Sequence, residues 1–243
     1  MENGKHLKDR PIAEFVAEDQ RTAKVFNAYD IDFYCHGEEL LSEVCKTNNL
    51  NIDTILNDLE ATTNAPYKGI NYKDIPLDEL ADCIQNVHHS YIEKQLPILT
   101  KQLDILCDSH GHEHEGLFML RSLFNDFSNA LLSHIKKEEL ILFPFIKELQ
   151  KAITTKKMDA SLFGTVKNPI SIAKEQHYNE DERFRFISQL TKNFSGFIGN
   201  CETYKDLITL LDEFEYNLHT HIHLENNILF PKAIALEQLY SVS

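Results

Sequence analysis

The sequence predicts an all-α protein in which a small helical domain precedes a four-helix bundle. Three observations predict it. Apolar residues recur at helical spacing over four long stretches, and these stretches show no strand-like alternation. Glycine, proline and asparagine mark the breaks between them. Residues 134–144 and 221–231 form an internal repeat, identical at seven of eleven aligned positions and offset by 87 residues (221 − 134).

Composition limits the classes of partner. The chain has 243 residues, 42% of them hydrophobic, which suits one medium domain with a small appendage. A net charge of −14 repels phosphate backbones and anionic lipid, so neither nucleic acid nor a membrane is an expected partner. The polar N-terminus and the lack of a long apolar run indicate the cytoplasm. Five scattered cysteines without a CxxC pair fit a reducing compartment.

The first domain is expected over residues 1–60. Its predicted helices begin at Pro11, span Arg21–Tyr29 and Gly37–Lys46, and open again after Asn51 to run over Ile52–Leu59. Residues 61–76 lack helical periodicity and contain proline, glycine and asparagine, so they are the predicted linker.

A Cys-His-Gly turn follows the second predicted helix. Cys35 stands there at the expected start of a helix, where a helix N-terminus would lower the pKa of the thiol and make it reactive. A half-buried structural cysteine is the equally weighted alternative.

The bundle is expected over residues 77–243. Its four helices are predicted at 77–108, 115–151, 169–192 and 201–238. Long helices joined by loops that allow antiparallel neighbours form a four-helix bundle, and such bundles hold metals when each helix contributes inward ligands at one height.

Each copy of the repeat holds a histidine and a glutamate four residues apart. His134 and Glu138 form one pair, and His221 and Glu225 form the other. One helical turn places both side chains of a pair on the same face, and flanking apolar residues turn that face inward. A pair of metal ligands is therefore favoured over a solvated surface pair.

The other two helices each offer one histidine at a matching place. His89, His134, His177 and His221 follow one another at intervals of 45, 43 and 44 residues. If each of four antiparallel helices contributes one ligand at the same height in the bundle, such near-equal intervals are expected.

The remaining histidines fit the centre less well. His88 points about 100° away from its neighbour His89. His219 and His223 flank His221 at two residues and are interpreted as surface or outer-shell residues. A glycine-containing loop holds His110, His112 and His114, which are expected to face solvent.

Four imidazoles and two carboxylates exceed what one tetrahedral zinc ion uses. They suit two metal ions, with Glu138 and Glu225 as bridges and two histidines on each ion. A ligand set of nitrogen and oxygen with open positions favours two non-haem iron ions, joined by an oxo or hydroxo bridge. Manganese is the alternative, and zinc is a poorer one. His-x-x-x-Glu repeated on two helices is the hemerythrin-type pattern, whereas ferritin-like bundles use Glu-x-x-His.

At these motifs the chain resembles the repair-of-iron-centres (RIC) family, hemerythrin-like di-iron proteins with a small N-terminal domain. The resemblance rests on the two repeat copies, on His89 six residues before Gln95-Leu96-Pro97, and on Pro169-Ile-Ser followed by His177. It implies four terminal histidines, two bridging glutamates, and cytoplasmic repair of iron–sulfur clusters damaged by nitric oxide or peroxide, through iron delivery. Damaged iron–sulfur proteins would be the clients.

The chain departs from that family in two places. The family's Asp-x-Cys-Cys-Gly-Gly is Asp32-Phe-Tyr-Cys35-His36-Gly37 here, so a mechanism that needs neighbouring cysteines is in doubt. The family's Glu-His pair on the third helix is Gln176-His177 here, which alters the surroundings of the ligand.

Two other functions use the same ligands. One is a hemerythrin-like sensor or store for dioxygen, nitric oxide or iron. The other is a redox enzyme that reduces nitric oxide or peroxide, so enzymatic turnover stays open. The extra N-terminal domain favours repair, since a bare carrier needs only the bundle. A homodimer also stays open.

Overall fold

The computed structural model describes residues 7–155 and 164–241, and the described residues confirm the all-α class. Their only β-type pairing is an isolated antiparallel bridge between Pro11 and Leu40. None of the described helices has the length and apolar character needed to cross a bilayer. By internal contacts the chain divides into two units, Met1–Leu80 with Ile222–Ser243, and Ala81–His221. The division after His221 falls inside one unbroken helical run.

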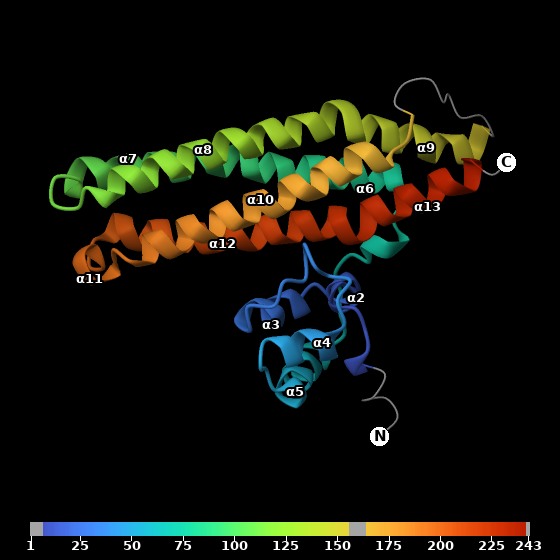
Figure 1. The fold of residues 1–243 in the computed structure, drawn as a ribbon, viewed down its shortest axis with the longest axis horizontal. Coiled ribbons are helices and arrows are strands. Elements are labelled where there is room, and N and C mark those ends of the chain that lie inside the picture. Colours follow the sequence, from blue (N-terminus) through green and yellow to red (C-terminus); the bar gives the residue numbers. More distant parts are fainter. Residues whose placement is uncertain (1–6, 156–163, 242–243) are drawn as a thin grey trace. The chain divides into compact units, whose positions relative to one another are not determined.

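The second unit holds the helix bundle. Four long helices run alongside one another in it (Figure 1), and α8 packs against both α7 and α10. Aromatic rings fill its interior: Phe127 contacts both Phe184 and Phe214, with centroids 5.3 and 6.1 Å away. The helices are α7 (Ser90–His110), α8 (Gly116–Lys137), α10 (Lys167–Lys192) and α12 (Glu202–Leu224).

Shorter elements extend three of these helices. α6 (Leu77–Cys83) and η2 (Ile84–His89) precede α7. η3 (Glu138–Leu142) and α9 (Phe143–Thr155) follow α8, and η4 (Glu225–Leu229) and α13 (Phe230–Ser241) follow α12. A short α11 (Ser195–Ile198) precedes α12. The continuous runs are 77–110, 116–155, 167–192 and 202–241, within a few residues of the predicted ends.

The elements η2, η3 and η4 are π-helical turns, which the sequence analysis treated as regular helix. η3 and η4 occupy matching places in the repeat, and each begins on a glutamate, Glu138 or Glu225. Pro144 and Pro231 follow them and have no backbone N–H to donate to the carbonyl four residues earlier. π-Helical turns inside α-helices occur frequently at functional sites.

The first domain contains the four helices expected of it, with one start corrected. They are α2 (Ile12–Glu18), α3 (Thr22–Ala28), α4 (Leu41–Thr47) and α5 (Ile52–Thr63). Asn51 caps α5 as expected, because its Oδ1 accepts hydrogen bonds from two backbone N–H groups of the first turn. The third helix begins at Leu41, however, and not at Gly37. Cys35 therefore lies in a turn six residues before α4, so the predicted effect of a helix N-terminus on its thiol was wrong.

Gly37 holds that turn against the first helix. A Cβ atom at position 37 would lie 2.5 Å from the Cβ of Ala13 and 2.6 Å from the carbonyl oxygen of Phe33. Such contacts are too close for any larger residue. The glycine that suggested a helix start is thus required for close backbone packing.

The predicted linker is partly structured. α5 extends into it as far as Thr63, and η1 (Tyr72–Asp74) is a 3₁₀ turn. Arg21 fixes the part between them: its guanidinium donates a hydrogen bond of 2.7 Å to the carbonyl oxygen of Ala65 and lies 5.5 Å from the ring centre of Tyr67. The domain boundaries at residues 60 and 76 stay a prediction.

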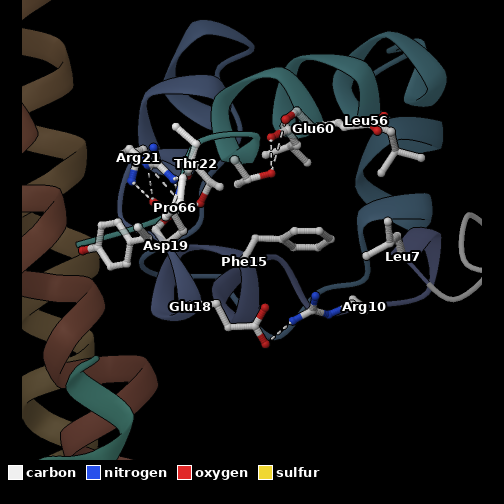
Figure 2. Close-up of a pocket in the computed structure, with 14 residues that line it drawn as sticks. Leu7, Arg10, Phe15, Glu18, Asp19, Arg21, Thr22, Leu56, Glu60 and Pro66 are labelled. Atoms are coloured by element: carbon white, nitrogen blue, oxygen red, sulfur yellow. Dashed lines mark hydrogen bonds and ion pairs between the residues drawn. The ribbon is translucent and has the colours of Figure 1, made fainter. Parts of the chain in front are cut away.

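A cavity of about 630 Å³ opens between this linker segment and the first domain (Figure 2). Its two arginines are paired within the domain. Arg21 donates to Asp19 at 2.9 Å, and Arg10 donates to Glu18 at 2.7 Å while lying over the ring of Phe15. The charges that border the cavity thus stabilise the domain itself.

Candidate metal centre

A buried glutamate, Glu138, lies at the middle of a histidine cluster in the bundle. Its Oε1 atom lies 3.4 Å from Nε2 of His134 and 3.6 Å from Nε2 of His177. Its Oε2 atom lies 3.6 Å from Nε2 of His89. The two oxygens of one carboxylate therefore face different histidines.

The four histidines form two pairs. Nε2 of His89 lies 3.2 Å from Nε2 of His221, and the two rings are nearly perpendicular. The rings of His134 and His177 are also perpendicular, with centroids 4.8 Å apart. All four side chains are at most 1% exposed. One oxygen of Glu138 thus faces both His134 and His177, and the other faces His89, whose ring contacts His221.

Glu225 stands one turn beyond His221, on the helical run that continues from α12 into η4. It is fully buried. The ligand atoms of His89, Glu138, His221 and Glu225 all lie within 4.8 Å of one another, and so do those of His134, Glu138, His177 and Glu225. The structure thus brings together all six residues that the sequence analysis named as ligands.

The Nδ1 atoms of His89 and His134, two of the candidate ligands, contact different partners. Nδ1 of His89 lies 3.1 Å from Oε1 of Glu139, whose other oxygen accepts a hydrogen bond of 2.7 Å from Lys136. Burial raises the pKa of Glu139, but hydrogen bonds from Lys136 and His89 outweigh burial and hold that pKa below its ordinary value. Nδ1 of His134 lies 3.0 Å from Oε1 of Gln176, a neutral amide.

Sequence reasoning missed Glu139 and treated Gln176 only as a departure from a family. The available signal for Glu139 was its place between Glu138 and the apolar run that begins at Leu140. The signal for Gln176 was its place directly before His177. Both residues lie next to a candidate ligand in the sequence. A prediction based only on which side chains face the centre of the bundle leaves out such neighbours.

Two histidines beside His221 are not surface residues, which corrects part of their interpretation. His219 is 6% exposed, and its Nε2 lies 3.0 Å from Oδ1 of Asp181. His223 is 1% exposed and packs edge-on against the ring of Phe33. Burial lowers the pKa of His223 to about 4, so its ring is neutral at pH 7. His88 is buried as well.

The cysteine-containing turn has a defined geometry. Oδ1 of Asp32 accepts hydrogen bonds from the backbone N–H groups of Tyr34 and Cys35, at 3.0 and 2.7 Å. Oδ2 of Asp32 lies 2.7 Å from Nδ1 of His36, and this hydrogen bond raises the pKa of His36. Cys35 is half-buried. It belongs to neither ligand group found among the described residues.

The turn is also tied to the helix that follows His221. Asn227 donates its side-chain amide to the carbonyl oxygens of Phe33 and Tyr34, at 3.1 Å each, and Asn226 donates to Tyr34 at 3.2 Å. Glu225 directly precedes both asparagines. The π-helical turn that begins on Glu225 is thereby anchored to the first domain.

The donor set fits a pair of metal ions. Neutral imidazole and carboxylate ligands suit iron, manganese and zinc. The two oxygens of Glu138 face histidines of different pairs, so one carboxylate can contact two ions at once. A buried carboxylate among four buried imidazoles is costly without a cation to offset its charge. The arrangement can therefore hold two ions, with two histidines on each.

Comparison with known proteins agrees with this geometry. Residues 84–233 match the "Hemerythrin HHE cation binding domain" family, and residues 8–63 match the ScdA_N family, described as "Domain of Unknown function (DUF542)". Proteins called "Iron-sulfur cluster repair protein YtfE" are similar over most of the chain. Those of Yersinia pestis (strain Pestoides F) and Yersinia pseudotuberculosis serotype O:3 (strain YPIII) are each 29% identical over 214 residues, 88% of this chain and 91% of the relative.

The hemerythrin match covers more than half of the chain and includes all six candidate ligands. The ScdA_N match adds the small N-terminal domain of the RIC pattern. The chain therefore belongs to the hemerythrin HHE cation-binding family, and its similarity to YtfE over most of its length matches the RIC pattern.

Proposed function

We propose that this chain is a di-iron protein that repairs iron–sulfur clusters damaged by nitrosative or oxidative stress, by supplying iron to them. One observation supports it most: the two oxygens of the buried Glu138 face histidines of different pairs, His89 on one side and His134 with His177 on the other. The similarity to YtfE proteins, whose name states iron–sulfur cluster repair, supports the choice of client.

Each residue has a distinct role in this proposal. His89 and His221 would hold one ion, and His134 and His177 would hold the other. Glu138 and Glu225 would serve both positions and offset the charge of both ions. Iron bound there supplies an exchangeable metal and one-electron redox chemistry. The ring of Phe143 stacks on His89 with centroids 5.3 Å apart, which limits both the motion of that ligand and the access of water.

The turn around Cys35 is the second element of the proposal. Its thiolate would transiently bind iron or an iron–nitrosyl group from the client, or would exchange with a disulfide of the client to form a mixed disulfide and release one thiolate. A cytoplasmic setting fits the five scattered cysteines, which contain no CxxC pair. Damaged iron–sulfur proteins are the proposed partners.

A repair assay tests the proposal. An iron–sulfur enzyme is inactivated with nitric oxide or peroxide, incubated with the iron-loaded protein under anaerobic conditions, and followed by recovery of its activity. We expect recovery with the wild type and none with Glu138→Ala, which retains the first domain but lacks the shared ligand. Equal recovery with both proteins, or with free ferrous iron alone at the same concentration, would contradict the proposed function.

A further inference from the structure

The hydrogen-bond acceptors behind the two histidine pairs differ in charge. His89 donates from Nδ1 to the carboxylate of Glu139 at 3.1 Å. His134 donates from Nδ1 to the amide oxygen of Gln176 at 3.0 Å. The two distances are nearly equal, so the two hydrogen bonds differ in the charge of the acceptor and not in length.

The carboxylate contact is held in place on both sides. Glu139 is 10% exposed at its side chain, and Lys136 binds its second oxygen at 2.7 Å. Lys136 in turn binds Glu93 at 2.6 Å. The orientation of the carboxylate towards His89 is thus fixed by a chain of ion pairs. Gln176 is half-buried and has no charge.

A hydrogen bond to an ionised acceptor is roughly twice as strong as one between neutral groups. A carboxylate behind a metal-binding histidine also makes that histidine a more basic ligand, and losing such a partner costs about 10- to 100-fold in metal affinity. His89 is therefore the stronger ligand and His134 the weaker one. The metal position that His89 lines should therefore bind its ion more tightly than the position that His134 lines.

We infer that Glu139 and Gln176 make the two metal positions unequal, so that the pair of His134 and His177 releases its ion first while the pair of His89 and His221 retains its own. Glu139 and Gln176 act as positioning residues through the histidines. The inference rests on the proposed function, since it assigns the delivered iron to one position. Under this inference the chain donates one iron per repair cycle, and the ion that is retained keeps the remaining ligands in their positions.

Release kinetics test the inference without a client enzyme. The ferrous protein, loaded with two irons, is mixed anaerobically with an excess of ferrozine, and the coloured complex is followed in time. The wild type should release iron in two phases of one ion each. Mössbauer spectra of half-depleted protein, enriched in ⁵⁷Fe, should show that one of two doublets has been lost.

Two isosteric substitutions assign the phases. Glu139→Gln should accelerate the slow phase by about 10- to 100-fold and leave the fast phase unchanged. Gln176→Glu should slow the fast phase by a similar factor. The double variant should exchange the order of the two positions. Glu148→Gln is the matched control, because Glu148 is exposed and pairs with Lys151, outside the chain of ion pairs that holds Glu139, and both phases should stay as in the wild type.

Three results would overturn the inference: release of both irons in one phase, acceleration of the fast phase by Glu139→Gln, or no effect of Gln176→Glu. The last variant keeps the test valid even if Glu139→Gln fails to fold. The outcomes are separable from those of the repair assay. Biphasic release without client recovery would contradict the proposed function alone, whereas recovery with single-phase release would contradict this inference alone.

Discussion

Oε1 of Glu138 lies 3.4 Å from Nε2 of His134, one helical turn apart where α8 continues into η3. The same carboxylate faces His177 with this oxygen and His89 with the other. A spacing of four residues thus places this carboxylate among three histidines, and the same spacing 87 residues later places Glu225 one turn beyond the fourth histidine, His221.

Replacing this glutamate should remove more metal than replacing one histidine. Glu138→Ala takes a ligand from both positions and the charge that offsets both ions, so most of the iron should be lost. We expect the same of Glu225→Ala. His134→Ala takes one ligand from one position and should leave the other ion in place. Iron per chain, measured by atomic absorption after gel filtration, checks this.

His219→Ala and His223→Ala are the controls. Both residues are buried but belong to neither ligand group, so both variants should retain their iron and lose stability, by about 1–3 kcal/mol. If the two controls lost metal as completely as the glutamate variants, the assignment of ligands on the fourth helix would be wrong.

His36 should titrate above its ordinary pKa of 6.5, because its ring is hydrogen-bonded to Asp32. A raised pKa in the folded state stabilises the fold below pH 6.5, and that stabilisation is lost as the pH rises through the folded-state pKa. Asp32→Asn should return the pKa of His36 towards 6.5, since Oδ1 can still cap the turn while the charge is gone. A proton NMR titration of the His36 ring measures this. An unchanged midpoint in the variant would contradict the cause given.

Asn227→Ala should destabilise the first domain. Its side-chain amide donates to two backbone carbonyls, of Phe33 and Tyr34, which would lose a partner in the variant. We expect a loss of about 1–2 kcal/mol in the free energy of unfolding by urea. Asn57→Ala is the control, because Asn57 is exposed in α5. Equal midpoints for the two variants would show that the anchor contributes nothing.

Cys35→Ser separates two roles of the N-terminal domain. If repair needs a thiol relay, the variant should keep its two irons and fail to restore the client enzyme. We expect this outcome. A variant with full repair activity would end the relay hypothesis and leave the first domain as a docking or dimerisation element. Cys45→Ser and Cys107→Ser, at buried helical positions, are the matched controls.

Much of this architecture could be predicted, because helix periodicity and the repeat are local signals. His89, His134, His177 and His221 stand at near-equal intervals, and a bundle of antiparallel helices turns such intervals into one common level. The burial of His219 and His223 could not be predicted, because it depends on tertiary packing. His219 is buried because Asp181 of another helix meets it, and His223 is buried because Phe33, far away in sequence, covers it.

The prediction that the third helix begins at Gly37 was wrong for the same reason, since α4 begins at Leu41. Gly37 indicates a helix boundary by composition, but its contacts with Ala13 and Phe33 show that it serves close packing. The π-helical turns that begin on Glu138 and Glu225 have no periodic signature of their own. A Phe-Pro pair follows each of these turns in the sequence. The proline indicates an irregular helical turn only when the helix is known to continue beyond it.

The metal content of the purified protein tests the central claim most directly. Protein from iron-replete cells, purified without chelators, should contain about two irons per chain, since six ligands with two bridging carboxylates match a di-iron centre. It should also absorb in the near ultraviolet and show little paramagnetism in the ferric state. Stoichiometric zinc without iron would contradict the account.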